Sequence, residues 1–173
     1  LPGFLKFLGP VFEKFGGTAG GYAKQTERTP INLKNKNILA PAICYESIYG
    51  EYMSKYVRKG ANIIAIITND GWWGNTPGYK QHLLYAKLRA IETRTWVLRS
   101  ANTGISCFID PVGEIHQPQN WWTAASTTLN IEATANKTFF VRMGDLLSKA
   151  ALLLSALLIL FSFYQRFIGR RKN

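Results

Sequence analysis

The chain has 173 residues, of which 47% are hydrophobic, and it carries a formal net charge of +11. This length and apolar content suit one domain with a buried core, and they exclude a disordered or fibrous protein. The two cysteines, Cys44 and Cys107, are too few for a disulfide scaffold, and no Cys/His cluster has zinc spacing, so we expect no metal.

The basic residues are distributed in a way that argues against a nucleic-acid partner. Four of the 21 lysines and arginines lie in the last eight positions, beside an apolar run, and most of the others are scattered. Scattered lysine indicates a solvated surface, and no RNA-binding or zinc-finger motif accompanies it. The first residues lack the pattern of a signal peptide, and we expect the chain to be the C-terminal portion of a longer protein.

Residues 1–37 combine apolar, aromatic and glycine-rich segments. Apolar residues recur at helical spacing at Leu5, Leu8, Phe12 and Phe15, and the segment GGTAGGYAKQ follows them. The pattern predicts a short amphipathic helix and then a mobile loop.

The next part of the chain alternates between strand and helix patterns. The segment NILAPAIC predicts a short buried strand that ends at Cys44, and ESIYGEYMSKYVRKG predicts an amphipathic helix that stops at Gly60. The run ANIIAIITN is apolar from Ile63 to Ile67 and predicts a buried central strand that ends in the polar residues Asn69 and Asp70.

The following elements complete the globular part. The segment DGWWGNTPG predicts a loop, and Tyr79 to Thr93 predict a long helix. Strands are predicted at TWVLRSAN, GISCFIDP and ASTTLNI, with a tight turn at PVGEI. Strands and helices alternate in the first part, and strands follow one another in the second. This order indicates an α/β layered domain whose helices cover a largely buried sheet.

Residues 146–168 have the composition of a transmembrane helix. Lys149 is the only charge in the first 20 of these residues, and its long side chain can reach the interface. A buried soluble helix would show a polar stripe, whereas the central part here offers only Ser155 and Ser162. The basic residues that follow predict that residues 169–173 are a cytoplasmic tail. The rest of the chain would then lie outside, which for a bacterial inner-membrane protein is the periplasm.

Cys44 stands where a predicted buried strand ends and a predicted helix begins. In this position its sulfur would emerge at the sheet edge where ligands bind, and a helix N-terminus would favour the thiolate. A nucleophile is one interpretation. A buried structural cysteine is the other, because free cysteine is among the most buried residue types, and position alone does not choose between them.

Four motifs resemble one enzyme superfamily. The segments ICYES, TNDGWWG, QHLLYAKLRAIETRTWVLRSANTGIS and IDPVGEI are similar, in this order, to the C-terminal half of the nitrilase, or carbon-nitrogen hydrolase, superfamily. Within it they resemble the apolipoprotein N-acyltransferases. The resemblance implies an αββα sandwich, with residues 38–135 as the C-terminal part of the catalytic domain. It also implies a glutamate base, a lysine and a cysteine nucleophile: Cys44 matches the cysteine, and the other two would lie upstream of Leu1.

The resemblance also assigns roles to neighbours of Cys44. Glu46 matches a second glutamate that would help to order the catalytic set, although an acid in a first helical turn also stabilises a helix without such a role. Tyr45 matches the tyrosine after the family's cysteine and, with Trp72 and Trp73, is predicted to bind substrate. Exposed tandem tryptophan is costly unless it packs or binds something apolar, so a loop packed on the core is the alternative.

The implied reaction is a two-step acyl transfer that needs no cofactor. Cys44 would take a fatty acyl chain from a phospholipid as a thioester, and the N-terminal diacylglyceryl-cysteine amine of an apolipoprotein would accept it. A phospholipid, an apolipoprotein and the membrane are therefore the expected partners, and the chain alone is expected to be inactive. Two alternatives stay open: a nitrilase-type amidase that hydrolyses a small amide, and a catalytically silent binding module.

The remaining polar residues receive structural interpretations. His82, Arg89 and Glu92 share one face of the predicted long helix. A lone helical histidine such as His82 is expected to pack or to form hydrogen bonds, and Arg89 and Glu92 are expected to form an ion pair. Arg99 ends a strand near the presumed site and would position loops. Cys107 lies within a strand and is predicted to be a structural thiol.

Overall fold

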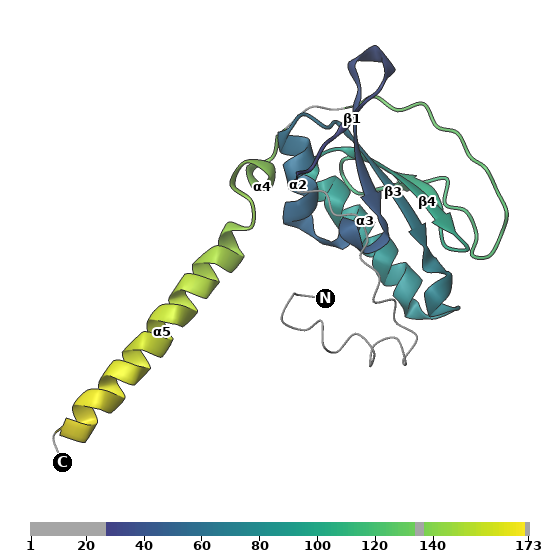
Figure 1. The fold of residues 1–173 in the computed structure, drawn as a ribbon. Helices are drawn as coiled ribbons and strands as arrows, with labels where there is room; N and C mark the ends of the chain where they lie inside the picture. Colours follow the sequence, from purple (N-terminus) through teal and green to yellow (C-terminus); the bar gives the residue numbers. More distant parts are fainter. Residues whose placement is uncertain (1–26, 134–136, 172–173) are drawn as a thin grey trace, which may run out of the picture.

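A computed structural model describes residues 27–133 and 137–171 (Figure 1). The helix predicted from the apolar spacing near the N-terminus lies outside the described residues, as do the last two residues of the basic tail.

The centre of the fold is one sheet of six strands in the order β1-β2-β3-β4-β5-β6. Its strands are β1 Ile31–Asn32, β2 Ile38–Ile43, β3 Ile63–Asn69, β4 Trp96–Asn102, β5 Cys107–Ile109 and β6 Ile115–His116. The three central strands β2, β3 and β4 run parallel. Strand β1 pairs antiparallel with β2, β5 antiparallel with β4, and β6 antiparallel with β5. The carboxyl ends of β2, β3 and β4 therefore meet at one edge of the sheet, which is where ligands bind in open α/β sheets.

Two α-helices cover one face of this sheet (Figure 1). They are α2, Gly50–Arg58, between β2 and β3, and α3, Pro77–Thr93, between β3 and β4. Three short 3-10 helices occupy connections: η2 Lys34–Lys36, η3 Cys44–Ile48 and η4 Asp70–Trp73. Two α-helices follow the sheet, α4 Phe139–Met143 and α5 Leu146–Arg171.

The core lies between the helices and the covered face of the sheet. Alternate strand residues point to this face and are buried, as the period of a strand requires. They meet apolar side chains of α2 and α3, and the cluster includes Ala40, Ala42, Ile64, Ile66, Val97 and Ile109 from the sheet and Met53, Tyr56, Val57, Leu83, Ala86 and Ala90 from the helices. A large-to-small substitution at the fully buried Ile64 would cost about 2–5 kcal/mol of stability.

The opposite face of the sheet is largely open. Ile43 on β2 is 67% exposed and Ile67 on β3 is 63% exposed, although both are apolar strand residues. One sheet with helices on one face corresponds to half of the αββα sandwich that the sequence resemblance implies. The predicted α/β layered architecture is therefore confirmed for this half.

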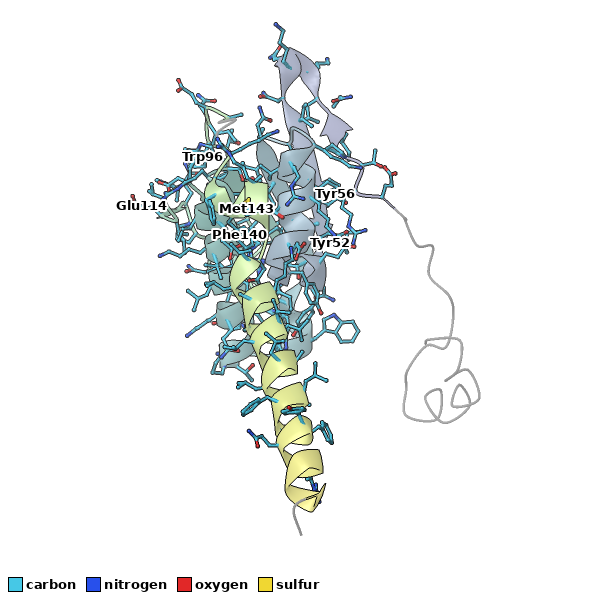
Figure 2. The ribbon with its side chains drawn as sticks, turned by 90° about the vertical axis from the view of Figure 1, so that its left-hand side faces the viewer. Tyr52, Tyr56, Trp96, Glu114, Phe140 and Met143 are labelled. Carbon is cyan, nitrogen blue, oxygen red and sulfur yellow. The ribbon has the colours of Figure 1, made fainter. Side chains whose placement is uncertain are left out.

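The C-terminal helices connect the domain to a long apolar segment. Arg58 donates a hydrogen bond from Nε to the Val141 carbonyl at 2.9 Å, which ties α4 to α2. Beyond α4, α5 projects away from the domain (Figures 1 and 2). Leu146–Arg166 is a stretch of 21 residues with a mean hydropathy of 2.2, and none of its most apolar window is buried within the molecule. By length and composition this helix can cross a bilayer, which confirms the predicted apolar C-terminal helix.

Three predicted elements differ from the structure. The segment DGWWGNTPG, predicted to be a loop, begins with the 3-10 helix η4. The segment ASTTLNI forms no strand: its first residues line a cavity with residues of β3, β4 and β5 but pair with none of these strands. The chain then loops away from the sheet (Figure 1). The predicted helix after Cys44 is also divided. Cys44 opens the five-residue η3, and the α-helix begins only at Gly50, because the extended Tyr49 separates the two.

Candidate active site

The candidate site lies where the parallel strands end. Cys44 follows β2 directly, and Asp70 follows β3 directly. Asn102 ends β4 in register with Asn69 of β3. The topology thus gathers the polar ends of three predicted strands at one edge.

Cys44 has an unusual backbone for a residue with a side chain. Its φ is 51°, in the left-handed region, and the residue is half-buried. This conformation costs roughly 1–2 kcal/mol for a residue other than glycine, so neighbouring contacts must hold it. The predicted stabilisation of a thiolate by an α-helix N-terminus is not provided directly, since α2 starts six positions later.

Glu46 holds the turn that carries Cys44. One carboxylate oxygen, Oε2, accepts a hydrogen bond from the Ile43 backbone N–H at 2.8 Å, and Oε1 accepts from the Tyr52 hydroxyl at 2.9 Å. Burial, together with hydrogen bonds to Tyr56 and Glu46, raises the pKa of Tyr52, so its hydroxyl stays a donor. Glu46 therefore joins the end of β2 to α2 across the turn.

A buried charged cluster lies beneath the turn. Asp70 Oδ1 is 3.0 Å from His82 Nδ1 and accepts from the Thr68 hydroxyl at 3.1 Å, while Asp70 Oδ2 accepts from Arg99 Nη2 at 2.6 Å. Asp70, His82 and Arg99 are all buried. Burial lowers the pKa of Arg99, and the charge of Asp70 opposes that shift. A Cβ at Gly104 would collide with the Asp70 carboxylate, so glycine is required beside it.

His82 extends this cluster to the turn that carries Cys44. Its Nε2 is 3.1 Å from Ser47 Oγ and 3.3 Å from the Cys44 carbonyl oxygen. The Ser47 hydroxyl in turn donates to the Cys44 carbonyl at 2.8 Å. The expectation that His82 forms hydrogen bonds is confirmed, and its partners are an acid on one side and the backbone of Cys44 on the other.

Aromatic rings enclose His82. The Tyr45 ring stacks on the imidazole with centroids 5.6 Å apart, and the Trp73 ring meets it edge-on at 5.5 Å. Tyr45 and Trp73 also contact each other, with centroids 5.7 Å apart. The two aromatic residues thus pack against the histidine that contacts Cys44.

The tandem tryptophans lie in different environments. Trp72 is 82% exposed, whereas Trp73 is half-buried and packs over Gly78, where any side chain would meet its ring. A cavity of about 60 Å³ lies among Tyr45, Trp73 and Tyr85. This volume is far below the roughly 300–1,000 Å³ of typical ligand pockets. The structure therefore brings Tyr45 and Trp73 together at the site, and it leaves Trp72 open to solvent.

Arg89 and Glu92 form the predicted ion pair, with Nε and Oε2 2.9 Å apart. Burial lowers the pKa of Arg89 and raises that of Glu92, and their mutual attraction opposes both shifts. Arg89 also donates from Nη1 to the carbonyl of Ile48 at 2.5 Å. The pair therefore supports the C-terminal end of the turn that carries Cys44.

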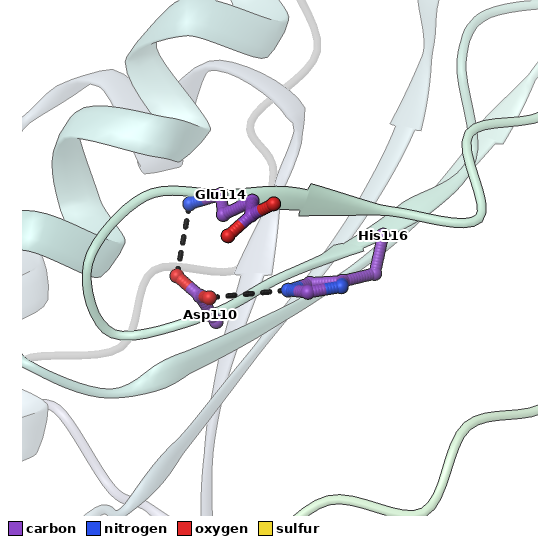
Figure 3. A group of neighbouring side chains, drawn as sticks. All are labelled: Asp110, Glu114 and His116. Atoms are coloured by element: carbon purple, nitrogen blue, oxygen red, sulfur yellow. Dashed lines mark hydrogen bonds and ion pairs between the residues drawn. The ribbon is translucent and has the colours of Figure 1, made fainter.

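Two acidic side chains and one histidine on the β5–β6 hairpin come close to one another (Figure 3). The candidate ligand atoms of Asp110, Glu114 and His116 lie within 4.8 Å of each other. Asp110 accepts hydrogen bonds from the backbone N–H groups of Val112 and Glu114, and its other oxygen is 3.1 Å from His116 Nε2. Partial burial raises the pKa of Asp110, but these hydrogen bonds lower it by more, so the net shift is downward. The hydrogen bonds of the hairpin turn are therefore enough to explain why these three side chains lie together.

Sequence reasoning missed two members of the site. Ser47 and Asp70 received no role, although both are fully buried. A signal was present for Asp70, because a charged residue directly follows an apolar strand at the edge where ligands bind. No comparable signal marked Ser47, whose contacts depend on how η3 turns. Cys107 is buried, and burial raises the pKa of its thiol to about 11, as expected for a structural cysteine.

Comparison with known protein families adds to this geometry. The family model of carbon-nitrogen hydrolases matches residues 6–137. The chain belongs to the carbon-nitrogen hydrolase family. The match covers the sheet, both covering helices and the Cys44 edge.

Relatives of this carbon-nitrogen hydrolase chain include proteins named apolipoprotein N-acyltransferase. One from Agrobacterium fabrum is 48% identical over 96 residues, which are 56% of this chain and 18% of the relative. One from Chlorobaculum tepidum is 34% identical over 87% of this chain and 30% of the relative. One from Bradyrhizobium diazoefficiens is 37% identical over 92% of this chain and 29% of the relative. The chain thus spans less than a third of their length.

Solved structures show the same fold. A Saccharomyces cerevisiae member of the nitrilase superfamily matches 65% of this chain and 42% of its own, with a TM-score of 0.52 and 20% identity. A carbon-nitrogen hydrolase from Helicobacter pylori matches 62% of this chain and 43% of its own, with a TM-score of 0.51 and 17% identity. These matches confirm the nitrilase fold predicted from the sequence.

Proposed function

We propose that this chain is the C-terminal portion of an apolipoprotein N-acyltransferase and that Cys44 carries the acyl chain as a thioester. The main support is the placement of Cys44: it is half-buried at the carboxyl edge of a parallel sheet, in a left-handed conformation, and both Glu46 and His82 contact the turn that carries it. The relatives named apolipoprotein N-acyltransferase and the apolar helix α5 support a substrate in a membrane.

The proposed reaction has two steps. The Cys44 thiolate attacks the carbonyl of a phospholipid ester, and the C–O bond breaks as the lysophospholipid leaves with a proton. The amine of a lipoprotein's N-terminal diacylglyceryl cysteine then attacks the thioester, loses a proton and releases the thiolate. A thioester suits this exchange because it stays reactive toward an amine. A glutamate base and a lysine upstream of Leu1 complete the set, and that lysine with backbone N–H groups near Cys44 stabilises the oxyanion.

The neighbours of Cys44 take distinct roles in this proposal. Glu46 orders the turn through its two hydrogen bonds. Tyr45 and Trp73 form an apolar wall beside the nucleophile, and the exposed Trp72 contacts an acyl chain or the lipid surface. An exposed tryptophan at the edge of an apolar site suits such a contact, since its ring is amphipathic.

The proposed location is the bacterial inner membrane. In this arrangement α5 crosses the bilayer, the catalytic domain lies in the periplasm and the basic C-terminus lies in the cytoplasm, in agreement with the bias of basic residues toward the inside.

The test is the covalent intermediate. We expect mass spectrometry of the full-length protein, incubated with phospholipid, to show an acyl adduct on Cys44 and a loss of the adduct when an apolipoprotein peptide is added. Cys44→Ser should form no productive adduct, whereas Cys107→Ala should form it normally. An adduct on Cys107 would overturn the assignment. Hydrolysis of small amides without transfer would favour the amidase instead.

A further inference from the structure

We propose that His82 is a positioning residue for the nucleophile: anchored by Asp70 and Arg99, it holds the Cys44 carbonyl and thereby keeps Cys44 in its left-handed conformation. The proposal rests on the proposed function only in naming Cys44 as the nucleophile. The contacts form a buried series of side chains that leads from Arg99 on β4 to the Cys44 turn at η3.

The anchor end of this chain is fixed by charge. Asp70 accepts from Arg99 at 2.6 Å and from the Thr68 hydroxyl at 3.1 Å, as a carboxylate does. Its Oδ1 then faces His82 Nδ1 at 3.0 Å, which makes Nδ1 the donor. The direct distance between Arg99 Nη2 and Nδ1 is longer, 3.4 Å, so the carboxylate is the shared acceptor of both groups.

The other end of the chain reaches the nucleophile. A carbonyl oxygen only accepts, so the 3.3 Å contact between His82 Nε2 and the Cys44 carbonyl is a hydrogen bond when Nε2 donates. The Ser47 hydroxyl is compatible with Nε2 as the donor, because it donates its own proton to the same carbonyl and can accept from Nε2 at 3.1 Å. Nδ1 thus faces the anchor, and Nε2 faces two oxygens of the turn, those of the Cys44 carbonyl and the Ser47 hydroxyl.

This arrangement explains how the turn holds a strained residue. The Cys44 backbone has φ 51°, and its carbonyl receives Ser47 and His82 from inside the domain. The side chain of Tyr45, the next residue, stacks on the same imidazole. His82 therefore contacts the turn at Cys44, Tyr45 and Ser47. It acts through the backbone rather than as the base.

Two substitutions at one position separate positioning from general packing. In His82→Gln an amide N–H lies at the ε position and can still donate to the Cys44 carbonyl. In His82→Asn the shorter amide can contact Asp70 but does not reach the turn. The matched control is His116→Asn on β6, whose imidazole contacts Asp110 on the hairpin and the Trp96 ring on β4.

Two measurements on the full-length protein in detergent decide the proposal. Hydrogen exchange of the peptide covering residues 43–49 needs no substrate, and we expect faster exchange in His82→Asn but not in His82→Gln or His116→Asn. We also expect His82→Asn to slow acylation of Cys44 about a hundredfold with KM for phospholipid nearly unchanged, since a displacement of about 1 Å costs this much. His82→Gln should recover most of the rate.

The outcomes that would overturn the proposal are equally specific. Wild-type exchange over residues 43–49 in His82→Asn would remove the positioning role, and so would equal defects in the Asn and Gln variants. If His82→Asn does not fold, Ser47→Ala serves instead, because it leaves the His82 contact to the Cys44 carbonyl in place. Exchange at the same peptide should then rise only slightly, and a complete loss of protection would mean that Ser47 holds the turn and would overturn the proposal. If the wild type forms no acyl adduct, the proposed function fails, while the exchange comparison still decides the role of His82.

Discussion

Arg99 and Asp70 form an ion pair with Nη2 and Oδ2 2.6 Å apart, and neither side chain is exposed to solvent. Within the part of the chain that the structure describes, Arg99 Nε and Nη1 have no hydrogen-bond acceptor. Asp70 is therefore the group that offsets the buried charge of the guanidinium, and it does so directly beneath the turn that carries Cys44.

The first prediction concerns the stability that this pair provides. Asp70→Asn leaves a buried guanidinium without its counter-charge, which typically costs about 3–5 kcal/mol. We expect the midpoint of thermal unfolding in detergent to fall clearly. Glu114→Gln, a substitution at an exposed residue, should leave it nearly unchanged. Combining Asp70→Asn with Arg99→Met should cost less than Asp70→Asn alone, because no unpaired charge remains. A double variant less stable than the single one would contradict this explanation.

The second prediction concerns the two thiols. Burial raises the pKa of Cys107 to about 11. At pH 8 only about one Cys107 in a thousand would be a thiolate, and the thiolate is the reactive form. We therefore expect iodoacetamide at pH 8 to label Cys44 and spare Cys107 in the folded protein, with Cys107 labelled as the pH approaches 11. Peptide mass spectrometry measures both sites, and Cys44→Ala serves as the control for labelling at Cys107. Equal labelling at pH 8 would show that Cys107 is accessible.

The third prediction concerns the chain of 173 residues expressed alone. We expect it to show no acyl transfer, since the proposed glutamate base and lysine lie outside it. Exposed apolar residues on the open sheet face, such as Ile43 and Ile67, should also make it bind a hydrophobic dye such as ANS. A transfer assay on the purified chain, with the full-length protein as control, decides the first point. Measurable transfer would mean that residues within this chain replace the upstream pair.

Sequence patterns predicted the central sheet because its strands are short and apolar, and they predicted α2 because its apolar residues have a clear helical period. Ile63–Asn69 and Pro77–Thr93 agree closely with the predicted strand and helix. ASTTLNI was wrongly predicted to be a strand because alternation indicates only that a segment suits a sheet, while pairing requires a neighbour at the right distance. The break between η3 and α2 escaped prediction for a related reason: the helical spacing continues through a turn that tertiary contacts of Glu46 and Ser47 fix.

The candidate site was only partly predictable. Cys44 and Glu46 were found through a short motif, and Arg89 with Glu92 through helical spacing. The link from Arg99 through Asp70 to His82 joins residues 12 to 29 positions apart, on three different elements. Such a contact depends on the register of β3 with β4 and on the rotation of α3, which sequence periodicity does not determine. The chain shows why buried polar partners are the last part of a site to emerge from sequence.

The last prediction concerns the orientation of α5, which separates a membrane acyltransferase from a soluble amidase without any substrate. The basic residues Arg170, Arg171 and Lys172 follow the apolar helix, and moving them across the bilayer opposes the bias of basic residues toward the cytoplasm. A reporter active only in the periplasm should therefore be silent when fused after Asn173, and a cytoplasmic reporter should be active there. With the outer membrane opened, a thiol reagent that cannot cross the inner membrane should label Cys44, and Cys44→Ala should abolish that signal. An active periplasmic reporter, or recovery of the full-length protein in the soluble fraction, would refute the proposed arrangement and favour hydrolysis of a small amide.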